Sequence, residues 1–325
     1  MPHATTRALL ALLLLSLAHS VAAQTDTYPG RPIRIVVTVP PGGAADFIAR
    51  TVGAKLSEAL AQAVLVENRA GASGTIAADA VAKAAPDGYT LLQNSITTHG
   101  VAPLIFAKLP YDSFKDLAPI TLLSQIPLIM VVNAEVPAGP VKDFVALAKA
   151  KPGSFSFASS GAGGAPHLTG ELFRSVTGID LVHVPYKGSG PAVTDLVAGR
   201  VQVMFDGAPA LLAHVRSGKL RVLAAASPQR NPLAPDAPTF AELGYPGIEV
   251  ALWYGLMAPA GTPRAIVDRL NAELARILNL PDIRERFAAQ GAAATPTTPE
   301  QFAQFMRREI ARWEPVVKRA GVKAE

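Results

Sequence analysis

The residues that could do chemistry in this chain gather in five short segments rich in glycine and small side chains. Each segment follows a run of apolar and β-branched residues, precedes a helical pattern and holds few charged side chains. The five segments are 40–46, 94–100, 159–167, 185–191 and 206–209. Glycine lets backbone N–H groups approach a ligand, and a helix that begins just beyond adds free N–H groups and the positive end of its dipole. Such loops can bind an anion without any arginine.

The candidate ligand-binding residues all lie on these loops. They are Pro41, Gly42, Gly43, Ala44, Asp46, Asn94, Ser159, Ser160, Gly161, Gly163, His167, Tyr186 and Asp206. Some have competing structural roles: we expect Asp46 to brace its own helix, and His167 to start or pack a helix rather than touch a ligand. Tyr186 and Asp206 stand at predicted strand ends, where function is favoured, and for Asn94 the sequence does not favour ligand contact.

Motifs typical of enzymes are mostly missing. The chain has no cysteine, no G-x-S-x-G and no G-x-x-x-x-G-K-[ST], and its six histidines lack metal-ligand spacing. Segment 161–166 starts like a dinucleotide fingerprint but has Pro166 where the third glycine belongs. We therefore expect no cofactor and no metal. Ser159 or Ser160 with His167 leaves a secreted serine hydrolase open as an alternative.

The N-terminus predicts export. Arg7 precedes an apolar run over 8–18, and small residues at 21–23 indicate a signal peptide over 1–23 with cleavage after Ala23. No later run is long enough for a transmembrane helix. We therefore expect the mature protein outside the cytoplasm, and without cysteine it has no disulfides.

Composition narrows the class of protein. Of the 325 residues, 50% are hydrophobic and 17% are charged, which is typical of a folded chain and long enough for two domains. The net charge of +5 is spread thinly and forms no basic stripe. Nucleic acid is therefore not an expected partner, and we expect a monomer.

The elements that must position these loops alternate between strand and helix in two series. Alternation of this kind predicts an α/β protein whose sheets are mostly parallel and flanked by helices. We predict one lobe from 24–127 plus 250–325 and a second from 128–249. Two C-terminal helices, at about 263–280 and 298–319, should pack on the first lobe, whose own helices are too few to cover its sheet. The predicted strands are 33–39, 63–68, 89–95, 127–133, 155–160, 181–185, 201–206 and 220–227.

Several motifs, in a fixed order over about 28–323, carry a resemblance to a known family. The chain resembles the substrate-binding proteins of tripartite tricarboxylate transporters, also called Bug receptors. The motifs include YPGRPIRIVVTVPPGGAADFIAR, VENRAGASGTIAADAVAKAAPDGYTLL, SSGAGGAPHLTGELF, HVPYKGSGPAVTDLVAGRV, PDAPTFAELGYPG and WYGLMAPAGTP.

The resemblance implies a two-lobed, type II periplasmic-binding-protein fold of the Venus flytrap kind. It implies a receptor, not an enzyme, that closes on a small organic carboxylate and delivers it to a permease with one large and one small membrane subunit. In the family, the loops matching 40–46 and 159–167 grip a carboxylate through backbone N–H groups and ordered water. Residues matching Asp206 and the end of the third strand define the other end of the ligand.

Two positions depart from the family pattern. Many relatives have Ser or Thr where this chain has Ala44, and many have Ser where it has Gly164. Both changes remove a hydroxyl donor and leave room for a bulkier or more apolar ligand. We therefore expect a mono-, di- or tricarboxylate, aromatic ones included. The alternatives are the serine hydrolase and a ligand-sensing module that acts on a signalling partner.

Overall fold

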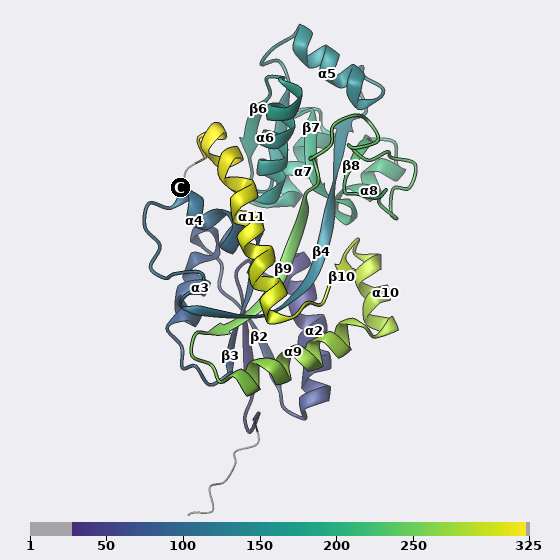
Figure 1. The fold of residues 1–325 in the computed structure, drawn as a ribbon. Coiled ribbons are helices and arrows are strands. Elements are labelled where there is room, and N and C mark those ends of the chain that lie inside the picture. Colours follow the sequence, from purple (N-terminus) through teal and green to yellow (C-terminus); the bar gives the residue numbers. More distant parts are fainter. Residues whose placement is uncertain (1–27, 323–325) are drawn as a thin grey trace, which may run out of the picture.

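The computed structural model describes residues 28–322, so the predicted signal peptide lies outside the described residues. The described chain forms an elongated molecule in which two sheets, each flanked by helices, are joined end to end (Figure 1). No helix among these residues is long and apolar enough to cross a membrane.

The first sheet has a parallel core to which antiparallel strands are added. β1 pairs in parallel with β2 and β3, β9 is antiparallel to both β3 and β4, and the short β10 pairs with β4. The order across the sheet is β2 (Val64–Asn68), β1 (Ile33–Val37), β3 (Thr90–Ser95), β9 (Ala251–Pro259) and β4 (Leu117–Asn133), with β10 (Ala293–Ala294) beyond.

The second sheet repeats this arrangement. β5 pairs in parallel with β6 and β7, while β4 is antiparallel to β7 and β8. The order is β6 (Val182–Pro185), β5 (Ser156–Ser159), β7 (Val203–Gly207), β4 and β8 (Leu220–Ala226). The first strand of each series, β1 and β5, therefore has the same place in its sheet, and the loops that follow these two strands are equivalent.

One strand belongs to both sheets. A strand was predicted to start at residue 127, but β4 starts at Leu117 and runs unbroken to Asn133. Residues 117–127 pair with β9, and residues 128–133 pair with β7 and β8. One connection between the lobes is therefore a hydrogen-bonded strand, with β9 beside its first part (Figure 1).

Helices cover both sheets. Around the first sheet lie α2 (Ala44–Leu60), η1 (Ala72–Gly74), α3 (Thr75–Ala82), the π-helix η2 (Ile96–Val101), α4 (Ala102–Ile105), α9 (Arg264–Leu278) and α10 (Pro281–Ala289). Around the second lie α5 (Val141–Ala150), α6 (Ala165–Thr177), α7 (Ser189–Val197) and α8 (Ala208–Arg216). α10 is an element that the sequence did not predict, whereas α9 packs on α2 and β4 of the first lobe, as expected.

The last helix, α11 (Pro299–Ala320), joins the two lobes. Thr298 and Gln301 form a capping box at its start, since each side chain accepts a hydrogen bond from the backbone N–H of the other residue. The prediction that this helix packs on the first lobe was incomplete. α11 packs on η2, α4 and β4, and also on α6 of the second lobe, so it runs along the side of the molecule across the junction (Figure 1).

Candidate functional site

A cavity of about 710 Å³ lies between the two sheets, where loops from both lobes meet. Its walls are formed mainly by backbone and small or apolar side chains, and Asp206 is the one charged residue among those that line it. The lining residues are Val39, Gly42, Gly43, Ala44, Phe47, Ser73, Ser95, Ile96, Thr97, Ile126, Ser160, Gly161, Ala162, Gly164, Ala165, Pro166, Ser189, Asp206, Gly207, Pro209, Ala210, Leu252, Tyr254 and Gln290.

The first lobe contributes the start of α2. Gly43 is the N-cap of this helix and provides no side-chain cap, so the N–H groups of the first turn keep their hydrogen-bonding capacity. A Cβ on Gly43 would meet nothing within 4 Å, which shows that this position faces open space. Gly42, with a φ of +92°, has a backbone conformation that favours glycine.

Asp46 holds this loop in place. Its carboxylate accepts a hydrogen bond from the N–H of Gly42 (3.1 Å) and pairs with Arg50 (2.9 Å). The hydrogen bond from Arg50, followed by that from Gly42, keeps the pKa of Asp46 below its usual value despite burial. Asp46 does not line the cavity, so the structure places it behind the loop as a brace.

The second lobe contributes the start of α6 at the equivalent place. Gly164 is the N-cap, again without a side-chain cap, and Gly161 and Gly163 have φ values of +152° and +72°. Ser160 and Gly161 line the cavity together with the first residues of the helix. α8 adds a third helix start, because its N-cap Gly207 also lines the cavity and lacks a side-chain cap. Three positive helix ends therefore converge on one space.

Asp206 is buried at the same cavity, and no lysine or arginine among residues 28–322 forms an ion pair with it. Ser189 Oγ donates a hydrogen bond to its carboxylate (2.6 Å), and the N–H of Gly207 donates another (2.7 Å). Burial raises the pKa of Asp206, and these two hydrogen bonds only partly offset the effect. The pKa of Tyr254, on the same cavity, is raised by burial and then by the charge of Asp206.

The thirteen predicted residues divide into two groups. Six line the cavity: Gly42, Gly43, Ala44, Ser160, Gly161 and Asp206. The other seven do not: Pro41, Asp46, Asn94, Ser159, Gly163, His167 and Tyr186.

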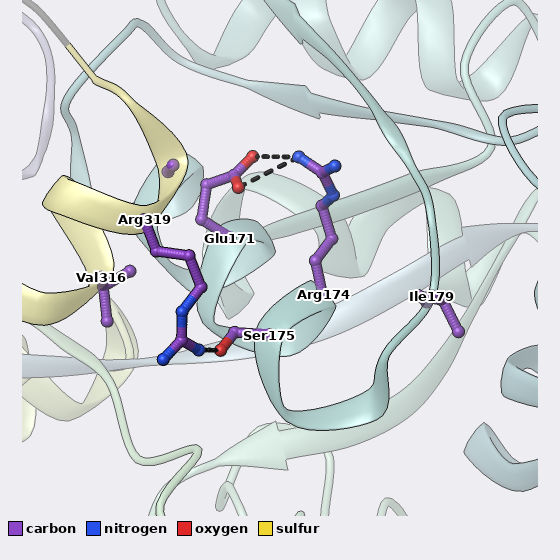
Figure 2. Close-up of a pocket in the computed structure, with 7 residues that line it drawn as sticks. Glu171, Arg174, Ser175, Ile179, Val316 and Arg319 are labelled. Atoms are coloured by element: carbon purple, nitrogen blue, oxygen red, sulfur yellow. Dashed lines mark hydrogen bonds and ion pairs between the residues drawn. The ribbon is translucent and has the colours of Figure 1, made fainter.

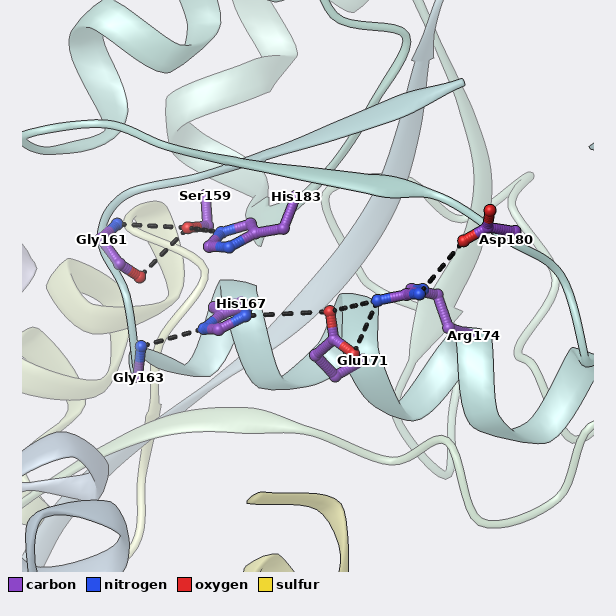
Figure 3. Close-up of polar contacts among 8 residues, drawn as sticks. All are labelled: Ser159, Gly161, Gly163, His167, Glu171, Arg174, Asp180 and His183. Atoms are coloured by element: carbon purple, nitrogen blue, oxygen red, sulfur yellow. Dashed lines mark hydrogen bonds and ion pairs between the residues drawn. The ribbon is translucent and has the colours of Figure 1, made fainter. Parts of the chain in front are cut away.

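The contacts of the second group explain where these side chains go. Asn94 is fully buried, and its Nδ2 lies 3.3 Å from Met306 Sδ of α11. Tyr186 donates its hydroxyl hydrogen bond to Asp195 (2.8 Å). Ser159 and His167 lie on the inner side of the loop that lines the cavity, and both bond to glycines of that loop (Figure 3).

Several lining residues were not predicted. Ser73 follows β2 in a Gly-Ala-Ser-Gly segment, and its φ of +56° marks a tight turn. The rule that ligands bind beyond the carboxyl ends of parallel strands could have found it. Three other lining residues come from regular elements: Phe47 from α2, Tyr254 from β9 and Gln290 from the end of α10. No local sequence signal indicates that they face the cavity.

A second cavity, of about 310 Å³, lies between α6 and α11 (Figure 2). Its charged groups are already engaged with protein partners. Glu171 accepts two hydrogen bonds from Arg174 (2.9 and 3.0 Å), and Arg319 donates to Ser175 Oγ. The inter-lobe cavity therefore remains the better candidate for a ligand. Among residues 28–322 no group of three His, Asp or Glu side chains could hold a metal ion.

The comparison with known families decides which kind of protein has this architecture. A family model described as "Tripartite tricarboxylate transporter family receptor" matches residues 48–322. The chain belongs to this family. The members are periplasmic solute-binding receptors, and the resemblance drawn from the sequence motifs is confirmed.

Relatives extend over nearly the whole chain. Protein BugT of Bordetella pertussis is 41% identical over 317 residues, which is 97% of each chain. Among solved structures, a protein of R. palustris with adipate has a TM-score of 0.83 and 36% identity and covers 91% of this chain and 99% of its own. MatC from Rhodopseudomonas palustris with bound malate has a TM-score of 0.79 and 36% identity and covers 89% of this chain and 100% of its own. The mixed α/β, two-lobed receptor fold is therefore shared.

Proposed function

We propose that this protein captures a small organic carboxylate in the inter-lobe cavity and delivers it to a tripartite tricarboxylate-type transporter with a large and a small membrane subunit. One observation carries the proposal: the uncapped N-termini of α2, α6 and α8 converge on one cavity, and no lysine or arginine in the described part of the chain lines it. Backbone N–H groups and helix dipoles are the groups that bind a carboxylate there.

The binding energy available from this arrangement is sufficient. A helix terminus contributes about 0.3–1 kcal/mol when exposed and up to about 2 when partly buried. Each hydrogen bond to a charged group contributes about 1.5–3 kcal/mol. A few of these would reach the roughly −8 kcal/mol of micromolar binding after the cost of ordering the ligand.

Asp206 sets a condition on the far end of the ligand. A second ionised carboxylate beside this buried group would be repelled, so a hydroxyl, an ammonium or a protonated carboxyl is favoured there. Phe47, Ile126 and Leu252 add an apolar wall to the cavity. Adipate and malate, the ligands in the two relatives, both carry two carboxyl groups, and the apolar wall together with Ala44 and Gly164 gives this chain space for a bulkier skeleton.

Location and domain boundaries belong to the same proposal. We infer export to the periplasm with cleavage after Ala23, which agrees with the periplasmic family. The lobes are assigned to 24–127 plus 250–325 and to 128–249. Support for the division near residue 127 comes from β4, which changes partners there from β9 to β7 and β8.

The test is a ligand panel on the purified chain from residue 24. Mono-, di- and tricarboxylates, including aromatic ones, are added while the melting temperature is followed, and positive ligands are confirmed by calorimetry. At least one carboxylate should raise the melting temperature, because a ligand that binds only the folded state stabilises it. A panel in which no member shifts the transition would refute the proposal.

We further propose that binding occurs without turnover. The hydrolase alternative has one observation in its favour, since Ser159 Oγ lies 2.7 Å from His183 Nε2. However, Ser159 is fully buried and bonded to Gly161, and among residues 28–322 no carboxylate is hydrogen-bonded to His183. A serine-reactive phosphonate should therefore leave the protein unlabelled, and labelling at Ser159 or Ser160 would favour the hydrolase. Capture of a signalling partner, but no permease subunit, would favour the sensing alternative.

A further inference from the structure

Two histidine rings are stacked directly behind the loop of the second lobe. His167 of α6 and His183 of β6 have ring centroids 3.7 Å apart and planes inclined by 6° (Figure 3). Phe157 of β5 continues the stack, with its ring centroid 4.8 Å from that of His183. Neither histidine lines the cavity.

Each ring holds one end of the loop 159–164. The N–H of Gly163 donates a hydrogen bond to His167 Nδ1 (3.0 Å). His183 Nε2 is bonded to Ser159 Oγ (2.7 Å). Ser159 Oγ in turn donates to the carbonyl of Gly161 (3.1 Å) and accepts from its N–H (3.3 Å). The pair therefore fixes both peptide groups of Gly161 and the N–H of Gly163.

The contact at Gly163 requires a particular protonation state. Because His167 Nδ1 accepts a hydrogen bond, its proton sits on Nε2, which points to Glu171 Oε1 at 3.8 Å. Glu171 itself is engaged by Arg174, which is bonded on its other side to Asp180. A protonated His167 would carry a hydrogen on Nδ1 and could no longer accept from Gly163.

Burial keeps both rings neutral. It lowers the pKa of His167 to about 3, with the neighbouring His183 and then Arg174 adding to the effect. It lowers the pKa of His183 to about 4, with Arg174 adding again. The charged groups that face the pair are Glu171 and Arg174, both from α6, while β5 presents Ser159 and Phe157 to it.

The first lobe provides an independent parallel. In both loops the residue before the N-cap glycine donates its N–H to the third residue of the helix: Gly42 to Asp46, and Gly163 to His167. In the first lobe the acceptor is a carboxylate whose charge is neutralised by Arg50. In the second lobe it is an imidazole.

We propose that His167 and His183, as a neutral stacked pair, are positioning residues that hold loop 159–164 in the conformation whose N–H groups bind the ligand. The proposal rests on the proposed function for its ligand, but the conformation of the loop can be measured without one. It assigns to two residues outside the cavity a share of the affinity for the carboxylate.

The experiment separates positioning from packing. His167→Leu and His183→Leu keep the bulk of the side chain but remove its hydrogen-bonding nitrogens. His167→Asn keeps an acceptor near the Nδ1 position, and His183→Gln keeps a polar group near Nε2. Affinity is measured by calorimetry with the tightest-binding carboxylate of the panel. Each leucine variant should bind about tenfold more weakly or worse, because one ordered N–H to a charged group is worth about that factor. The Asn and Gln variants should recover most of the loss, and His214→Asn, on α8, should bind like the wild type.

Two further readouts do not depend on ligand. Nitrogen-15 spectra of the imidazoles should show His167 as the neutral Nε2–H tautomer at pH 7, with both rings still neutral at pH 5. Amide exchange at Gly163 should accelerate at least tenfold in His167→Leu but not in His167→Asn. If the wild type binds no carboxylate, the proposed function fails while these readouts still decide the inference. A cationic His167 at pH 7, leucine variants with wild-type affinity, or unchanged exchange at Gly163 would each overturn it.

Discussion

Replacing Gly43 by valine tests whether the start of α2 is the anion site. Gly43 is the N-cap of α2 with extended backbone (φ −91°, ψ −178°), a conformation that valine adopts without strain. A Cβ there would meet no protein atom within 4 Å, yet the residue lines the cavity. The added isopropyl group therefore occupies space in the cavity and not in the core.

The magnitudes of the two effects differ clearly. Valine is a poorer N-cap than glycine, so we expect a loss of about 1 kcal/mol of stability, which lowers the melting temperature by no more than about 2–4 °C. A blocked approach removes two hydrogen bonds to the carboxylate, each worth about 1.5–3 kcal/mol. The expected loss of about 3–6 kcal/mol corresponds to a Kd raised by a factor of about 10²–10⁴.

The assay is calorimetric titration of Gly43→Val with a carboxylate that the wild type binds, together with thermal unfolding of the free protein. Gly30→Val is the matched control, because Gly30 precedes β1 at the opposite end of the strand and a Cβ there meets only Tyr89 Oη, at 3.9 Å. The control should bind like the wild type. If Gly43→Val bound within threefold of the wild type, backbone recognition at α2 would be disproved.

Three other changes probe the site and the core. The pKa of Asp206 is raised by burial, so ionisation of this group opposes folding as the pH rises. Asp206→Asn should therefore be more stable than the wild type at pH 7. Chemical denaturation should show that the difference in stability shrinks as the pH falls through the raised pKa. The same variant should bind dicarboxylates more tightly at pH 7 than the wild type. Asp46→Ala frees the N–H of Gly42 and should weaken carboxylate binding severalfold. Because the pKa of Asp46 is lowered, its contribution to stability is present above the usual pKa and is lost as the pH falls through the lowered value. Melting temperatures of the wild type and of Asp46→Ala over a pH series check this. Glu309→Leu leaves the indole N–H groups of Trp253 and Trp313 without their shared acceptor. The free energy of unfolding, measured in urea by tryptophan fluorescence, should fall by about 2–5 kcal/mol. The control Glu314→Leu, on the exposed side of α11, should change it by less than about 1 kcal/mol.

The course of β4 shows where sequence patterns stop being informative. Pro119 and Pro127 both lie inside this strand, and a proline in an apolar run normally indicates a break because it cannot donate to the ladder. In the structure, the register of β4 with β9 shifts just after Pro119, and Pro127 forms the last pair with β9 before the strand joins β7 and β8. Each proline therefore occupies a place where pairing is interrupted or exchanged, which local sequence cannot distinguish from the end of a strand.

The loops that line the cavity were predictable for the opposite reason. Their position depends on a local succession of strand, glycine-rich turn and helix, and the parallel order of the strands then places several such turns at one edge of each sheet. Which residues of a loop face the cavity depends on packing between distant segments. Tyr254 reaches the site because β9 pairs with β3, and Gln290 reaches it from the end of α10, so neither carries a local signal.

The two equivalent loops also show why an acceptor at the third helical position is required and why its chemistry differs. The N–H of the buried Gly163 must be paired inside the protein, since an unsatisfied buried donor is costly, and Asp46 is the corresponding acceptor for the N–H of Gly42. A carboxylate at this position places a negative charge near the proposed anion site, and Asp46 is tolerated because Arg50 neutralises it. Glu171 and Arg174 already pair with each other beside the second loop, so a further charge there would have no counter-ion. A neutral imidazole supplies the acceptor without a charge, which accounts for a histidine at 167 where the first lobe has an aspartate.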